Sequence, residues 1–135
     1  MSEQLLALAR EVGREAAAFV AGRRPSGRVD VSSTKSSPTD IVTEIDEASE
    51  RLIRERIFAA RPDDGFVGEE GNDVVGTTGV EWVVDPIDGT VNFVYGIPTY
   101  AVSIAARHEG EVVAGYVINI ASGAEWGAVR GAGAW

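Results

Sequence analysis

The spacing of apolar side chains changes once along this chain, and this change constrains the class of fold. In the amino-terminal part, apolar residues such as Leu5, Leu8 and Val12 recur at the three- to four-residue spacing of amphipathic helices. From Phe66 onward they form short runs or alternate with polar residues, as is typical of strands. We therefore predict an α+β fold in which two amino-terminal helices pack on one face of a mostly antiparallel sheet.

Local signals mark the ends of these elements. The first helix is expected to begin at Ser2 and to end at 22–25, where a glycine, two arginines and a proline follow one another. The second is expected to begin at 43–46, which resembles a capping box, and to end at 61–65. The polar stretch 28–37 between them is expected to be an extended loop or a hairpin. Strands are expected at 66–67, 81–84, 100–107, 111–120 and 124–130, joined in part by hairpin-like links at 108–110 and 121–123.

The composition is that of one soluble domain, residues 1–135. Hydrophobic residues make up 44% of the chain and charged residues 24%, which is typical of globular proteins. The chain has no cysteine, which excludes disulfides, thiolate catalysis and cysteine-ligated zinc, and which favours a reducing compartment such as the cytoplasm. It has no apolar run of membrane-spanning length, and its start at 2–4 lacks the basic residues of a signal peptide.

The acidic residues are distributed unevenly. The net charge of −9 argues against a nucleic-acid partner, because nucleic acids require a basic surface. Between Arg61 and Arg107 there is no basic residue, whereas eight acidic ones occur: Asp63, Asp64, Glu69, Glu70, Asp73, Glu81, Asp85 and Asp88. Those at 63, 64 and 73 lie in loop-like surroundings and are expected on a solvated surface. The others interrupt strand-like stretches, where a carboxylate needs a cation, and a bound metal would supply it.

The segment 82–93 carries the strongest candidate site. An apolar strand is expected to end at Asp85, Pro86 forces a turn, and Asp88 is expected to cap a helix that starts with Gly89 and Thr90. Two carboxylates with the carbonyl of Ile87 between them are hard oxygen ligands, which suit Mg²⁺ better than zinc or copper. The amides of Gly89 and Thr90 could hold a phosphate beside the metal.

Each of these residues also has an ordinary structural explanation. Asp88 alone is more often a helix cap than a metal ligand, and Asp85 alone could be a turn residue. It is their combination at a strand-to-helix switch, in a segment without basic residues, that favours a metal site.

Two further elements extend the candidate site. We interpret Glu69 as a direct metal ligand and Glu70 as an outer or water-mediated contact, although this pair could be a solvated turn. Asp46 could accept a hydrogen bond from the Thr90 hydroxyl and so orient it toward a metal-bound water. Alternatively, Asp46 completes a capping box and Thr90 is a simple first-turn residue. The sequence alone leaves both alternatives open.

Three motifs resemble those of the inositol monophosphatase family, a group of Mg²⁺-dependent, lithium-sensitive phosphatases. They are D-I-V-T-E-I-D at 40–46, G-E-E at 68–70 and D-P-I-D-G-T-V-N-F at 85–93, and the stretch A-V-R-G-A-G-A at 128–134 matches as well. The resemblance covers practically the whole chain, and the aspartate motif is highly specific. One small departure is Val91, which stands where a threonine is common.

The resemblance implies a role for each candidate residue. Glu69, Asp85 and the Ile87 carbonyl would bind the activating metal, while Asp85 and Asp88 would contribute to a second one. Thr90, supported by Asp46, would position the attacking water. Two residues would lie further out: Lys35, on a mobile loop near the site, and Glu70, which matches the second acidic residue of the family.

The resemblance also implies that the chain is incomplete. Family members are about twice as long, and a later Trp-Asp motif, absent here, supplies another aspartate to the second metal. Residues 1–135 would then be the metal-binding amino-terminal half of a layered αβαβα sugar-phosphatase fold.

Two hypotheses about function remain open. The first is Mg²⁺-dependent hydrolysis of a small phosphate monoester, with inositol monophosphate favoured; relatives also use fructose bisphosphate, histidinol phosphate and 3′-phosphoadenosine nucleotides. The second is a non-catalytic, metal-binding fragment that self-associates. Exposed strand edges would be compatible with a homodimer.

Overall fold

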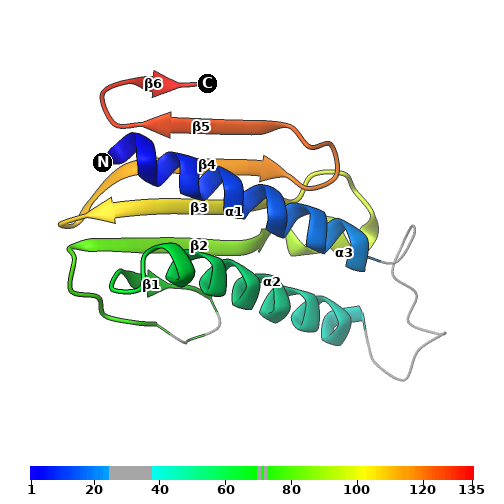
Figure 1. Ribbon diagram of the computed structural model, residues 1–135. Helices are drawn as coiled ribbons and strands as arrows, with labels where there is room; N and C mark the ends of the chain where they lie inside the picture. The colour runs from blue at the N-terminus through cyan, green and yellow to red at the C-terminus, as the bar shows by residue number, and fades with distance from the viewer. Residues whose placement is uncertain (25–37, 70, 72) are drawn as a thin grey trace.

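Two long helices lie side by side on one face of a six-stranded sheet in the computed structural model of this chain (Figure 1). The structure describes residues 1–24, 38–69, 71 and 73–135. The helices are α1 (Ser2–Arg23), α2 (Pro38–Ala60) and the short α3 (Thr90–Tyr95). The strands are β1 (Gly65–Val67), β2 (Val80–Asp88), β3 (Ala101–His108), β4 (Glu111–Asn119), β5 (Glu125–Val129) and β6 (Gly133–Ala134).

The strands follow one another across the sheet in chain order. The pair β1 and β2 is parallel, and all later neighbours are antiparallel. The predicted α+β class, with helices on a mostly antiparallel sheet, is confirmed. No helix in the described part of the chain is long and apolar enough to span a membrane.

The core lies between the two helices and the sheet. Along β2 the side chains of Val80, Trp82 and Val84 are buried, and the residues between them are only partly so. Helix α1 approaches β4 closely at Gly13, where an added Cβ would lie 2.4 Å from Cε2 of Tyr116. Because the buried side chains alternate along β2, the alternating pattern in the sequence indicates which face of this strand packs against the helices.

Helix α2 begins at Pro38, earlier than the capping-box motif at Thr43 indicated. Proline suits the first turn of a helix because the N–H that it lacks would have had no partner there. Thr43 and Asp46 therefore lie inside the helix, and the capping-box prediction is wrong. The predicted loop at 28–37 falls outside the described residues.

The end of β2 also differs from the prediction. The strand does not end at Asp85 but continues to Asp88, with a register shift between these two residues. Pro86 lies in this irregular stretch, where its missing N–H interrupts no regular ladder. The helix cap is Gly89 rather than Asp88, because the turn into α3 requires a φ of +88°.

Asp64 is buried, which corrects the expectation that it lies on a solvated surface. Its side chain is 1% exposed and accepts hydrogen bonds from Arg61, from the Thr78 hydroxyl at 2.7 Å and from the Trp82 indole at 2.9 Å. Burial opposes ionisation of this carboxyl, but the three hydrogen bonds outweigh burial and lower the pKa of Asp64. The side chain thereby ties the end of α2 and the start of β1 to β2.

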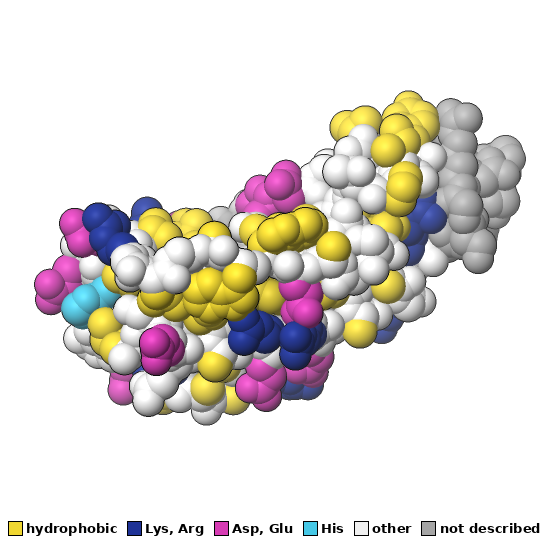
Figure 2. Space-filling view, turned by 90° about the horizontal axis from the view of Figure 1, so that it is seen from above, with side chains coloured by type: hydrophobic (Ala, Val, Ile, Leu, Met, Phe, Trp, Pro, Cys, Tyr) yellow, Lys and Arg dark blue, Asp and Glu magenta, His cyan; other side chains and the backbone are white. Residues whose placement is uncertain are grey.

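The β6 edge of the sheet has no further strand beside it in the described part of the chain. Seen from this edge, apolar and charged side chains are interspersed on the surface (Figure 2). Trp126 of β5 is 53% exposed and Trp135 is 57% exposed. These observations leave the predicted homodimer untested.

We predict that Asp64→Asn lowers the free energy of unfolding by about 1–3 kcal/mol at pH 7, because it leaves buried donors poorly paired. The pKa of Asp64 is lowered on folding, so its ionised form stabilises the fold above pH 3.8 and this contribution is lost as the pH falls further. Urea unfolding should therefore show that the difference from wild type narrows in that acidic range. The exposed neighbour supplies the control, Asp63→Asn; an equal loss there would contradict the prediction.

Candidate metal centre

The parallel pairing of β1 with β2 brings two predicted site residues together. Val67 lies opposite Val83, and the same register continued by two residues places Glu69 opposite Asp85. The Glu69 side chain lies close enough to Asp85 to lower the pKa of its carboxyl. The sequence had left open whether the two segments run parallel or antiparallel.

The environment of Asp85 disfavours its negative charge. Burial raises the pKa of this carboxyl, and the charges of Asp88 and Glu50 raise it further. Hydrogen bonds with the Glu69 side chain and the Ile87 backbone act in the opposite direction without cancelling the rise. Asp85 thus lies in an acidic surrounding that would favour binding of a cation.

One oxygen of Asp85 has no hydrogen-bond partner in the part of the chain that the structure describes. Its Oδ1 is buried and makes no hydrogen bond within the described residues. A buried carboxylate oxygen in that state is costly unless something else pairs with it. The nearby groups are carboxylates and backbone, which are hard oxygen donors, so the residues present fit a hard divalent cation such as Mg²⁺.

Asp88 acts on Asp85 through its charge, which raises the pKa of Asp85. It is the exposed last residue of β2, and together with Gly89 and Asn92 it lines an open hollow of about 380 Å³. In the part of the chain that the structure describes, no three acidic, histidine or cysteine side chains are grouped closely enough to hold a metal ion. The structure therefore brings Glu69 and Asp85 into contact, with Asp88 close enough to shift the pKa of Asp85.

The acids of β2 are paired with arginine at one end of the strand only. Glu81, at the start, forms an ion pair with Arg107 of the neighbouring strand. Asp85 and Asp88, at the far end, have no arginine or lysine partner among the described residues. The negative charge that is left without a basic partner lies at the candidate site.

The predicted pairing of Asp46 with Thr90 stays a prediction. Asp46 is a half-buried residue of α2, Thr90 is the first residue of α3, and the two helices contact each other. The carbonyl of Gly89 accepts the first helical hydrogen bond, from the amide of Phe93. The amides that precede it in the first turn have no hydrogen-bond partner within the helix. Lys35 and Glu70 lie outside the described residues.

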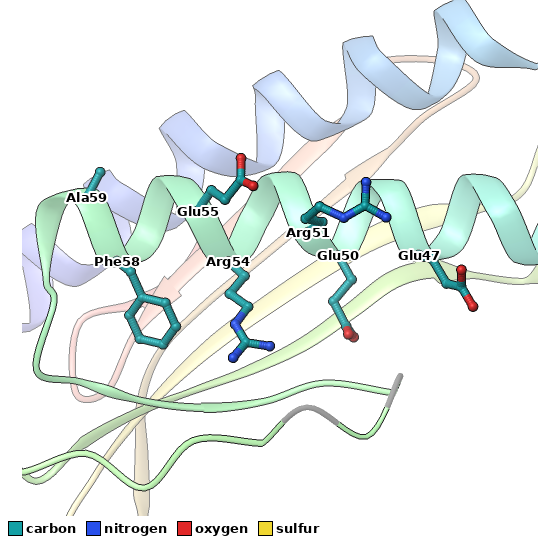
Figure 3. Close-up of a pocket in the computed structure, with 7 residues that line it drawn as sticks. All are labelled: Glu47, Glu50, Arg51, Arg54, Glu55, Phe58 and Ala59. Atoms are coloured by element: carbon teal, nitrogen blue, oxygen red, sulfur yellow. The ribbon is translucent and has the colours of Figure 1, made fainter.

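Glu50 is a site residue that sequence reasoning missed. Its side chain is 4% exposed, and its Oε1 accepts a hydrogen bond of 2.7 Å from the backbone amide of Glu69. Figure 3 shows it projecting from α2 on the same side as Arg54 and Phe58. The available signal was its spacing, because Glu50 lies one helical turn after Asp46 and so on the same face.

Comparisons with known proteins agree with this arrangement. The model of the inositol monophosphatase family matches residues 1–135. The chain belongs to the inositol monophosphatase family. An inositol-1-monophosphatase of Mycobacterium bovis is 49% identical over 144 residues, which cover 97% of this chain and 50% of that protein. The structure of Mycobacterium tuberculosis SuhB superposes with a TM-score of 0.81 at 45% identity, covering 99% of this chain and 47% of that one.

The chain thus spans about half the length of the relatives that it matches. Another relative, 43% identical over 108 residues, covers 79% of this chain and 40% of its own length, and is the Nus factor SuhB of Pasteurella multocida. The family and the predicted αβ arrangement of its amino-terminal half are confirmed. The exclusion of nucleic-acid partners stays a prediction.

We predict that Asp85→Asn stabilises the metal-free protein, because it removes a partly buried charge surrounded by other negative charges. Thermal unfolding in EDTA should show a higher Tm than that of the wild type. The matched control is Glu81→Gln on the same strand. This substitution removes the ion pair with Arg107 and should not raise the Tm. A lower Tm for Asp85→Asn than for wild type would show that the charge is compensated within the protein.

Proposed function

We propose that the complete protein carrying this chain is a Mg²⁺-dependent phosphomonoesterase whose preferred substrate is inositol monophosphate. The proposal is supported by the buried Oδ1 of Asp85, which has no partner within the described residues and lies beside Glu69, in a chain that belongs to the inositol monophosphatase family. The names of several relatives favour the same substrate.

Specific residues would hold the metal. Glu69, Asp85 and the carbonyl of Ile87 would bind one Mg²⁺, Asp85 and Asp88 would contribute to a second, and Glu70 would act through water. Bound Mg²⁺ lowers the pKa of a coordinated water and neutralises charge on the phosphate. Burial and the charges of Asp88 and Glu50 raise the pKa of Asp85, which supports this assignment, since a site poor in positive charge gains most from a cation.

Other groups would orient the substrate and the attacking water. Thr90, with its hydroxyl oriented by Asp46, would hold the water in line with the phosphorus. The amides of Gly89 and Thr90 would donate hydrogen bonds to phosphate oxygens, which suits phosphoryl transfer because it depends mainly on positioning and charge neutralisation. Lys35 would approach the site from the segment between α1 and α2.

Several properties of the complete protein belong to the same proposal. We expect it to be cytoplasmic, inhibited by lithium, free of nucleic acid and membrane as structural partners, and able to form a homodimer. An aspartate beyond residue 135 would complete the second metal site. If the chain acted only as a metal-binding, self-associating fragment, it would bind Mg²⁺ and turn over no phosphate ester.

We predict that Asp85→Asn lowers kcat/KM for inositol 1-phosphate by about 100-fold or more in the complete protein, because charge stabilisation by a metal is worth several kcal/mol. Phosphate release is measured against Mg²⁺ concentration, with histidinol phosphate and 3′-phosphoadenosine nucleotides as competing substrates. Asp63→Asn, exposed and outside the site, should retain wild-type turnover. Undiminished turnover by Asp85→Asn would overturn the proposed mechanism.

A second measurement separates enzyme from fragment. Residues 1–135 alone should show little or no hydrolysis of the same substrates, because one expected metal ligand and most groups that would read the substrate lie outside them. Vigorous hydrolysis by this piece would mean that the remainder of the protein is dispensable for catalysis.

A further inference from the structure

We propose that Glu50 is a positioning residue, whose buried carboxylate fixes the turn after β1 so that the Glu69 side chain faces Asp85. The inference rests on the proposed function, because the position of Glu69 matters for catalysis only if Glu69 binds the metal. The inference gives a role to Glu50, which lies on α2 and contacts the backbone of Glu69 instead of binding the metal itself.

The first support is the hydrogen bond at the turn. Strand β1 ends at Val67, so the next two amides have no partner in the ladder. Two carboxylates accept hydrogen bonds from these amides. The Gly68 amide donates to Asp73 at 3.2 Å, and the Glu69 amide donates to Glu50 at 2.7 Å. A hydrogen bond to an ionised acceptor is stronger than a neutral one, so this contact restrains the backbone that carries Glu69.

The second support is the close approach of Glu50 to Gly68. A Cβ added at Gly68 would lie 2.2 Å from Oε1 and 2.5 Å from Cδ of Glu50, which is closer than atoms can pack. The carboxylate therefore rests against the bare backbone of the turn. We call Gly68 and Glu50 a matched pair, because a side chain at position 68 would occupy the space that the Glu50 carboxylate fills.

The third support is the neighbouring residue on α2. Ser49 is buried, and its hydroxyl donates a 3.4 Å hydrogen bond to the carbonyl of Pro86, in the irregular part of β2 that follows Asp85. Two successive residues of one helix thus contact the two segments that carry Glu69 and Asp85. Because a helix is rigid over one turn, α2 sets the separation between the two predicted ligands.

The main alternative is that Glu50 binds the metal directly. Its charge reaches Asp85, since it contributes to the raised pKa there. However, its Oε1 is engaged by the Glu69 amide, and both Oε1 and Cδ lie against Gly68. A direct ligand and a positioning residue predict different effects on metal binding when Glu50 is replaced by a residue that keeps the acceptor oxygen and removes the negative charge.

Isothermal titration of the complete protein with Mg²⁺, and with Mn²⁺ as a second probe, distinguishes them. Glu50→Ala should weaken divalent binding by about 10- to 100-fold, the usual effect of losing a group that orients a ligand. Glu50→Gln keeps an acceptor oxygen for the Glu69 amide, although a weaker one, and should lose much less affinity than Glu50→Ala. Glu55→Ala, at an exposed position of the same helix, is the control and should bind normally. Equal losses in Glu50→Ala and Glu50→Gln would indicate a direct ligand and overturn the positioning role.

A double-mutant cycle tests the matched pair. Gly68→Ala alone should weaken Mg²⁺ binding, because the new methyl group displaces the carboxylate or the turn. In the Glu50→Ala background the methyl group has room, so the additional loss should be much smaller. Additive losses would contradict the proposal. If Glu50→Ala does not fold, Glu50→Asp replaces it in the cycle, since its carboxylate is set back by one methylene group.

The outcomes separate the two proposals. A wild-type protein that binds Mg²⁺ and hydrolyses inositol 1-phosphate, with Glu50→Ala binding Mg²⁺ equally well, would overturn only the role of Glu50. A wild-type protein that binds no divalent ion would overturn both. The amide of Glu69 gives a readout independent of activity, because its hydrogen exchange should accelerate in Glu50→Ala and stay slow in Glu55→Ala.

Discussion

The contact between the carboxylates of Glu69 and Asp85 is the constraint around which the rest of this structure is arranged. Acidic groups gathered in one place repel when ionised, and the charges of Asp88 and Glu50 raise the pKa of Asp85 although the contact with Glu69 lowers it. A fold keeps such an arrangement only if the surrounding structure over-determines it. The surroundings do so: the Asp64 hydrogen bonds fix the start of β1 against β2, and residues 49–50 of α2 contact both segments that carry the acids.

The one parallel pair in an otherwise antiparallel sheet explains how these acids meet. In a parallel pair both strands advance in the same direction, so the residues that follow β1 run alongside the later part of β2. Had β1 run antiparallel to β2, Glu69 would lie toward the start of the strand, near Glu81, which already has an arginine partner. The direction of a three-residue strand thus decides whether the candidate site exists.

Sequence reasoning located most of the elements but misplaced residues whose surroundings come from distant contacts, and it misplaced two helix starts. Periodicity located α1 and the strands from β2 to β5, because burial on one face repeats locally. It misjudged Asp64, which accepts hydrogen bonds from Thr78 and Trp82, and it missed Glu50, which packs against Gly68. It also assigned the cap of α3 to Asp88, since aspartate is a common cap, whereas the left-handed turn at this position requires Gly89.

The distribution of charge along β2 argues that the cation at this site comes from outside the described protein. A generally acidic surface would leave its acids solvated, and an ordinary structural network would pair them with arginine, as at Glu81. Asp85 fits neither case, because one of its oxygens is buried without a partner in the described part of the chain and its pKa is raised rather than lowered. Three residues further on, Asp88 is exposed beside an open hollow. A partly buried acid with one oxygen left without a partner among the described residues, next to acids that solvent can reach, is an arrangement that a divalent ion stabilises.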